Sequence, residues 1–163
     1  MNKNFPISLF SIVFAFVLLL SLPLVAKPKP PTQPPVQLQF SVQFILEQVL
    51  SKKNMAFKPD VKTPAIYMSS VVPLRQFQDA IEPQWGLRPD SIINAFIILK
   101  NEIYLLDEAA YYKKNNRCID DSLAHELTHY IQSQYQGFDL NDDSLEADAI
   151  EIQTWFRETY CKE

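Results

Sequence analysis

His125-Glu126-Leu127-Thr128-His129 contains both histidines of this 163-residue chain. On a helix, a spacing of four residues places the two imidazoles on one face, about one turn apart, where they can hold a single metal ion. Glu126 would project beside them toward a water bound to that metal. The residue types and their spacing therefore predict a zinc site.

The residues around this motif predict a helix of roughly 120–136. Its apolar face is formed by residues at helical spacing, namely Leu123, Leu127, Ile131 and Tyr130 or Tyr135. Asp120, Asp121 and Ser122 can cap its start, and Gly137 is a natural stop. Both histidines are thus expected on an amphipathic helix, which argues against a chance occurrence of so short a motif.

A catalytic zinc takes three protein ligands and keeps one position open for water. Because the chain has no third histidine, the third ligand is expected to be a carboxylate. A second helix of roughly 142–160 follows, with Leu145, Ala149, Ile152, Phe156 and Tyr160 at helical spacing. The candidate ligands are acidic residues near its start: Asp142, Asp143, Glu146, Asp148 and Glu151. Acidic residues there also serve as caps, so the composition alone leaves the choice open.

These residues resemble the gluzincins, the thermolysin-like branch of the zinc metallopeptidases, in the very short form called a minigluzincin. The resemblance rests on the histidine motif followed by Glu146-Ala147 on the next helix. It also rests on Asn94-Ala95-Phe96, which looks like the edge-strand stretch that holds extended substrate in that family. The run from Glu146 through Ala149 to Gln153 is similar to the glutamate helix of small bacterial proteins of this type. The resemblance covers roughly residues 92–156.

The resemblance implies a set of site residues: the zinc ligands His125, His129 and Glu146, the general base Glu126, and the substrate-binding residues Asn94 and Ala95. In many gluzincins an acid four residues after the ligand glutamate orients a zinc histidine. Here that position is Ile150. Asp148, another side chain or backbone carbonyls are then expected to fix the histidine tautomers.

The expected reaction is hydrolysis of a peptide bond by a zinc-activated water, with Glu126 passing a proton from the water to the leaving amine. A further donor must stabilise the oxyanion, and the unranked candidates are Tyr111, Tyr112, Tyr135 and Arg157. The expected partner is a peptide or protein substrate. One alternative is a non-catalytic zinc-binding envelope module that holds a peptide or protein. Another is a hydrolase of cell-wall peptide bridges.

Residues 5–26 carry no charge and are mainly apolar, and Lys3 precedes them. Residues 1–26 are therefore expected to be a signal peptide or a membrane anchor, with the protein exported to the periplasm or cell exterior, or held at the membrane. Residues 27–36 form a proline-rich linker that excludes helix and central strand. With nineteen acidic and fifteen basic side chains, the chain is not expected to bind nucleic acid.

Residues 37–163 suffice for one domain. We expect an α+β, minimal zincin-like fold with a small antiparallel sheet, the histidine-motif helix and a following glutamate helix. The other expected elements are helices at Leu38–Lys53 and Leu74–Ile81, a strand at Ala65–Ser69, and a hairpin of Ile92–Leu99 and Glu102–Leu106 around a Lys100-Asn101 turn.

Cys118 and Cys161 are expected to form a disulfide, because an exported protein meets an oxidising compartment. A short connection makes the two motif helices antiparallel, so the start of the first and the end of the second lie on the same side. Cys118 lies about 10 Å along the helix axis from His125, which is too far for a zinc ligand.

Overall fold

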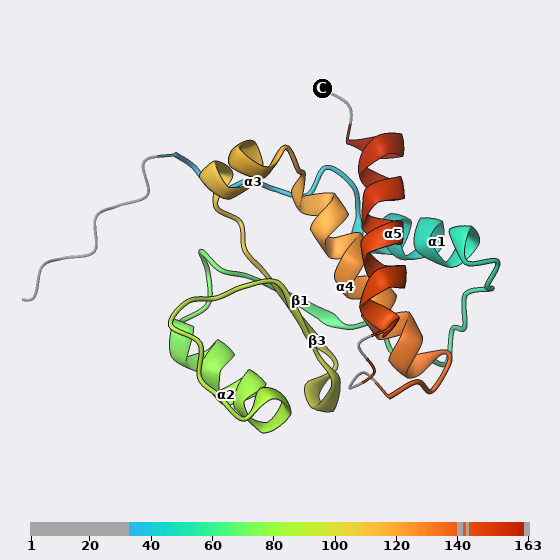
Figure 1. Ribbon diagram of the computed structural model, residues 1–163, viewed down its shortest axis with the longest axis horizontal. Coiled ribbons are helices and arrows are strands. Elements are labelled where there is room, and N and C mark those ends of the chain that lie inside the picture. Colours follow the sequence, from blue (N-terminus) through green and yellow to red (C-terminus); the bar gives the residue numbers. More distant parts are fainter. Residues whose placement is uncertain (1–32, 140–141, 143, 162–163) are drawn as a thin grey trace, which may run out of the picture. The chain divides into compact units, whose positions relative to one another are not determined.

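The computed structural model describes residues 33–139, 142 and 144–161, which form an α+β unit with five α-helices and a three-stranded sheet (Figure 1). The expected signal or anchor over residues 1–26 and most of the linker over residues 27–36 lie outside these ranges. The last linker residues, 33–36, form neither helix nor strand. Within the described ranges, no helix combines the length and the apolar character needed to cross a membrane.

The sheet is mixed, with strand order β1-β3-β2. β2 (Ala95–Ile97) and β3 (Glu102–Leu105) form the expected hairpin, which turns through a 3-10 segment and a left-handed Asn101 with φ 53°. β1 (Ala65–Met68) runs parallel to β3. The expectation of a wholly antiparallel sheet was therefore wrong. After β1 the chain passes through a helix to β2, which lies at the opposite edge of the sheet. β3 then follows β2 in the hairpin and lies between the two outer strands.

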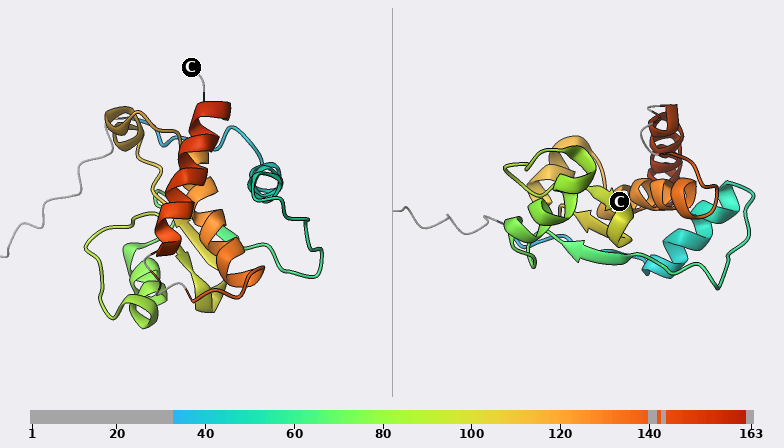
Figure 2. Two further views of the ribbon diagram at one scale, coloured as in Figure 1. Left: turned by 45° about the vertical axis from the view of Figure 1, so that its right-hand side comes forward. Right: turned by 90° about the horizontal axis from the view of Figure 1, so that it is seen from below.

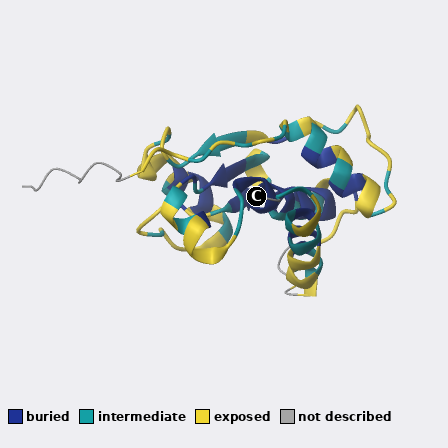
Figure 3. Ribbon diagram, turned by 90° about the horizontal axis from the view of Figure 1, so that it is seen from above, coloured by how far each residue is buried: buried dark blue, intermediate teal, exposed yellow. Residues whose placement is uncertain are grey.

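α4 (Ile119–Gln134) contains the histidine motif and confirms the predicted helix of roughly 120–136. Figure 3 shows how much of this helix and of the sheet is buried. The start of α4 is capped by a pair of reciprocal hydrogen bonds. Cys118 Sγ accepts the Asp121 N–H, and the Asp121 carboxylate accepts the Cys118 N–H. Gly137 follows the helix with φ 70°, as expected for a stop.

Asp120 does not cap α4, contrary to expectation, but is fully buried. Its carboxylate accepts hydrogen bonds of 3.0 Å from the backbone N–H groups of residues 39 and 40. This contact anchors the bend ahead of α1 (Val42–Lys52). The first helix consequently starts after the capping residue Ser41 and not at the predicted Leu38.

α2 (Leu74–Trp85) is one turn longer than the predicted Leu74–Ile81. It continues through Pro83, which is exposed, and ends where Gly86 adopts φ 68°. A proline near the last turn costs little because the carbonyl it leaves unpaired can reach solvent. The extra turn carries Gln84, which lies at the site described below.

α5 (Ser144–Tyr160) confirms the predicted glutamate helix and packs against α4, as the further views in Figure 2 show. Cys118 and Cys161 are joined in a disulfide with a Cα–Cα distance of 6.1 Å. This bond connects the start of α4 to the end of α5. α3 (Ala109–Asn115), which the sequence did not predict, leads into α4.

Candidate metal centre

Three side chains converge where the middle of α4 meets the first turn of α5. His125 Nε2 and His129 Nε2 lie 3.1 Å apart, and the Glu146 carboxylate lies 3.3 Å from the first and 3.2 Å from the second. Ligand atoms held about 2.0–2.1 Å from a tetrahedral zinc are themselves about 3.3 Å apart. The donor atoms therefore have the chemistry and the spacing that a zinc ion requires.

The contact between His125 and Glu146 is not an ion pair at neutral pH. Burial lowers the pKa of His125 to about 4, and the nearby His129 contributes to the same effect. A neutral imidazole offers the carboxylate no positive charge. The Glu146 carboxylate thus faces an uncharged imidazole at His125, an arrangement that a metal cation would stabilise.

The tautomer of His129 is fixed by Gln132, which is completely buried. Gln132 Nε2 donates to the Leu145 carbonyl at 2.9 Å and to Asp148 Oδ2 at 2.8 Å, so its Oε1 is left as an acceptor. Oε1 lies 2.9 Å from His129 Nδ1, which must therefore carry the proton. His129 Nε2 then directs a lone pair toward Glu146.

Asp148 supports the site without belonging to the ligand set. Its Oδ2 accepts from Gln132 and also pairs with Lys53 Nζ at 2.5 Å, so it acts on His129 through the glutamine. Asp148 and Gln132 thus orient His129, the role that an acid at the position of Ile150 plays in many gluzincins. Gln132 was not predicted from sequence, although its position on the buried side of α4, three residues after a candidate ligand histidine, was a usable signal.

The other candidate acids lie elsewhere. Asp142 Oδ1 accepts the Ser144 N–H at 2.9 Å and serves as a cap, while Glu151 is exposed. Asp143 lies outside the described residues. Within the described ranges, Glu146 is the acid that groups with the two histidines.

His125 Nδ1 is buried and has no hydrogen-bond partner among the residues that the structure describes. The backbone of Ala149 lies near enough to favour the protonated imidazole, although it does not meet the geometry of a hydrogen bond. His129 is therefore held by a hydrogen bond, whereas His125 is positioned mainly by packing between α4 and α5.

Glu126 lies on α4 beside the two histidines and is 5% exposed. Burial raises its pKa to about 8, and the charge of Glu146 adds to the shift. The backbone N–H of Phe96 on β2 lies near enough to the carboxylate to oppose the shift. Glu126 and Phe96 thus line the same cavity, and the raised pKa of Glu126 suits proton transfer near neutral pH.

The three cluster side chains and Glu126 line a cavity of about 290 Å³. The rest of its wall is formed by the end of α2, by β2 and by the residue that precedes β2: Gln84, Trp85, Asn94, Ala95 and Phe96. The expected substrate-binding residues, Asn94 and Ala95, are therefore brought to the metal cluster. Asn94 uses its side-chain oxygen to accept the Leu106 N–H at 2.8 Å, which fixes its position next to β3.

The backbone of Ala95 is not directed outward. Phe96 C=O accepts from Gln84 Nε2 at 3.0 Å, and Ile98 N–H donates to Gln84 Oε1 at 2.9 Å. Because backbone groups alternate in direction along an antiparallel strand, Phe96 faces outward and Ala95 faces its β3 partner, Tyr104. The backbone groups of Ala95 are therefore engaged with β3 and are not free to pair with an extended substrate.

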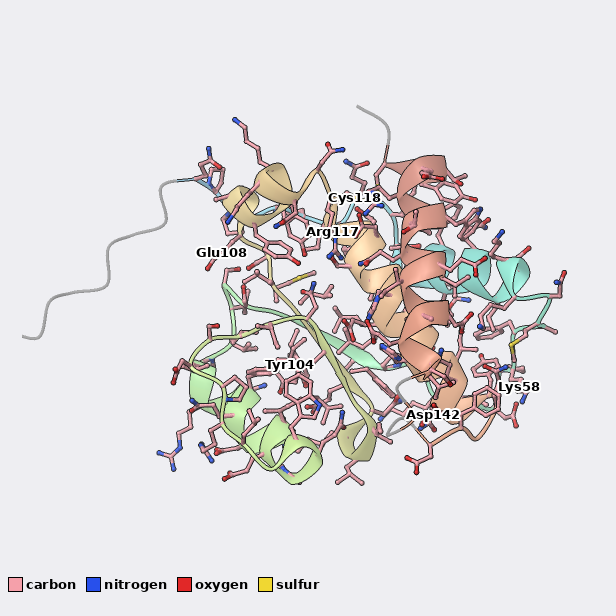
Figure 4. The ribbon with its side chains drawn as sticks, viewed as in Figure 1. Lys58, Tyr104, Glu108, Arg117, Cys118 and Asp142 are labelled. Atoms are coloured by element: carbon pink, nitrogen blue, oxygen red, sulfur yellow. A yellow bond between two sulfur atoms is a disulfide. The ribbon has the colours of Figure 1, made fainter. Side chains whose placement is uncertain are left out.

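A second hollow of about 520 Å³ also reaches His125, Glu126 and Glu146 and includes Tyr111 and Arg117. Arg117 Nη1 donates to the Tyr111 hydroxyl at 3.3 Å, and the arginine charge lowers the pKa of both His125 and Glu126. Figure 4 labels Arg117 next to Cys118, at the start of α4. Arg117 was not predicted from sequence, because nothing local indicates that it turns toward the cluster.

The structure separates the other oxyanion candidates from the cluster. The Tyr112 hydroxyl donates to the Leu106 carbonyl at 2.6 Å. Tyr135 contacts Lys58, and Arg157 lines a different hollow next to the disulfide. Tyr111 is therefore the candidate tyrosine that lies at the site.

Comparisons with known proteins found no counterpart for this arrangement. No protein-family model matches the chain, and neither a curated protein nor a solved structure matches it. Its chemistry therefore has to be inferred from the contacts of its own residues.

Proposed function

We propose that this protein is a zinc-dependent metallopeptidase. The observation that carries the proposal is the spacing of 3.1 to 3.3 Å between His125 Nε2, His129 Nε2 and the Glu146 carboxylate. A buried glutamate beside this group supports an enzyme over a module that only binds zinc. Burying a carboxylate is costly, and a binding module has no use for one at this place.

His125, His129 and Glu146 would hold the zinc, which when bound supplies a Lewis acid that acidifies water and polarises a carbonyl. Glu126 would accept the proton of the attacking water and return it to the leaving amine. The backbone N–H of Phe96 lies close to this carboxylate. The proposed base would thus sit between α4 and β2, while α4 and α5 would supply the zinc ligands.

Tyr111 and Arg117 would stabilise the negative charge that develops on the carbonyl oxygen during hydrolysis. Arg117 Nε and Nη2 bind Asp121 Oδ1 and Ser122 Oγ at 3.0 and 2.9 Å, which hold the guanidinium in place. Fixed donors are effective because they need no reorganisation as charge develops.

Exposed apolar side chains surround the two hollows. Trp85 is 41% exposed, Ile93 40% and Ile150 50%. Exposed apolar surface beside a polar site is typical of a ligand-binding rim. These side chains support a substrate that carries apolar residues next to the bond that is cut.

Metal analysis of the purified protein, with a digest of a broad peptide library, tests the proposal. The unaltered protein should hold one zinc per chain and cut peptides, and Glu146→Gln should lose zinc because a neutral amide is a poorer ligand than a carboxylate. Glu151→Gln, an exposed acid on the same helix, is the matched control and should retain both properties. Zinc binding without any hydrolysis would favour the non-catalytic module, and full zinc content in Glu146→Gln would contradict the ligand set.

A further inference from the structure

The side chain of Gln84 occupies the outer edge of β2, next to the candidate metal centre. Its Nε2 donates to Phe96 C=O and its Oε1 accepts from Ile98 N–H, at 3.0 and 2.9 Å. These two backbone groups are the ones that a neighbouring β-strand would use. One glutamine amide therefore supplies the donor and the acceptor that a residue of an added strand would supply.

Two further backbone groups of this segment point outward. Ile98 C=O accepts the N–H of Asn101 within the turn, and Phe96 N–H lies close to the Glu126 carboxylate. Three of the four outward backbone groups of Phe96 and Ile98 are thus hydrogen-bonded inside the protein, and the fourth faces a carboxylate. An extended peptide can hydrogen-bond to this edge only if it displaces Gln84 or Glu126.

The position of Gln84 depends on the extra turn of α2. Pro83 lies within this turn and Gly86 ends it, and the turn places Gln84 and Trp85 in the wall of the 290 Å³ cavity that the two histidines also line. The backbone of Gln84 is thus part of a helix, and its side chain occupies the edge through two hydrogen bonds.

We propose that Gln84 is a specificity-determining residue that closes the edge of β2 to extended peptide backbone. Substrates then enter the cavity as short segments that bind through their ends and side chains, and they gain nothing from a longer main chain along β2. This inference rests on the proposed function, since it assigns the substrate class of the same site.

The test measures binding of fluorescent alanine- and leucine-containing peptides of three to nine residues to the zinc-treated protein. The Glu126→Gln background is used throughout, so that no peptide is cut during the measurement. Gln84→Ala frees two backbone groups, and Gln84→Met frees the same groups while keeping the side-chain volume. The matched control is Gln78→Ala, because Gln78 also lies on α2 and binds a backbone carbonyl, that of Pro89, at 2.9 Å.

Peptide affinity should hardly depend on length in the parent protein and in Gln78→Ala. In Gln84→Ala the peptide affinity should rise about tenfold as the peptide is lengthened, because the longer peptide can form two new backbone hydrogen bonds to β2. N-methylation of alternate peptide nitrogens should abolish that gain and should leave binding to the parent unchanged. Thermal unfolding confirms that each variant is folded.

The absence of a length-dependent gain in both folded Gln84 variants overturns the inference. Strong sensitivity of the parent protein to N-methylation overturns it as well, and this measurement does not depend on any Gln84 variant. A gain in Gln84→Ala, together with failure of the unaltered protein to cut any peptide, would support the closed edge and refute the peptidase assignment.

Discussion

His129 Nδ1–H donates a hydrogen bond to Gln132 Oε1 at 2.9 Å. The other ring nitrogen, Nε2, then has a lone pair that is directed at the candidate metal centre. Gln132 is itself held by two further hydrogen bonds, to the Leu145 carbonyl and to Asp148. The orientation of His129 on α4 is thus set, through Gln132, by residues at the start of α5.

Replacing Gln132 by leucine should weaken zinc binding about 10- to 100-fold, because His129 loses the acceptor that fixes its tautomer. Competition with a chromogenic chelator measures the zinc affinity. Gln134→Leu, an exposed position on the same helix, is the control and should bind zinc like the unaltered protein. Equal zinc affinities in folded Gln132→Leu and unaltered protein would show that Gln132 does not orient the ligand.

The sequence predicts the two helices that carry the site because their signals are local. The histidine spacing, the apolar periodicity and Gly137 lie within one segment, and the observed α4 (Ile119–Gln134) agrees closely with the prediction. The spacing to Glu146 was informative for a similar reason, since a short connection forces the second helix back along the first.

The positions that sequence reasoning missed depend on contacts between distant segments. Gln84 reaches β2 because α2 continues through Pro83, where a local reading favours an earlier end. The parallel pairing of β1 with β3 depends on the path of the chain between them. Asp120 binds the backbone of residues 39 and 40, a contact that no local pattern encodes.

Tyr111→Phe should lower the rate of peptide hydrolysis about 10- to 100-fold with zinc content unchanged, because the hydroxyl beside Arg117 would no longer stabilise the oxyanion. Its neighbour gives a matched control. Tyr112→Phe removes a hydroxyl that is bonded to the Leu106 carbonyl, so it should cost stability of about 1 kcal/mol without a comparable loss of rate. Comparable losses of kcat in the two variants would contradict the role of Tyr111.

Reducing the disulfide should lower the free energy of unfolding by about 4 kcal/mol on the chain-entropy model. The reason is that Cys118 and Cys161 close a loop across a sequence separation of 43. Urea unfolding of the Cys118→Ser, Cys161→Ser double variant measures the loss. Two reactive thiols in denatured, unreduced protein would refute the bond.

Asp121 should make stability depend on pH, because burial raises the pKa of its carboxyl while Arg117 only partly opposes the shift. A carboxyl with a raised folded-state pKa binds its proton more tightly when folded, so its contribution to stability is lost as pH rises above the ordinary value of 3.8. The stability advantage of the unaltered protein over Asp121→Asn should therefore shrink as pH rises toward neutrality.

Asp79 serves as a control with the opposite pH trend, because its hydrogen bond with Arg88 lowers the pKa of this exposed carboxyl. The stability advantage of the unaltered protein over Asp79→Asn should therefore shrink as pH falls. Urea unfolding at several pH values measures both trends. An advantage over Asp121→Asn that grows with pH would reverse the sign and contradict the account of this buried group.

The central claim, that Glu126 moves the proton beside a zinc held by its neighbours, is tested most directly by peptide hydrolysis in Glu126→Gln at matched zinc content. The glutamine keeps the size and the hydrogen-bonding capacity of the side chain but cannot accept the proton of water. Hydrolysis should fall by a factor of about 10² to 10⁴, with one zinc per chain retained. Hydrolysis at the unaltered rate in zinc-loaded Glu126→Gln would contradict the mechanism.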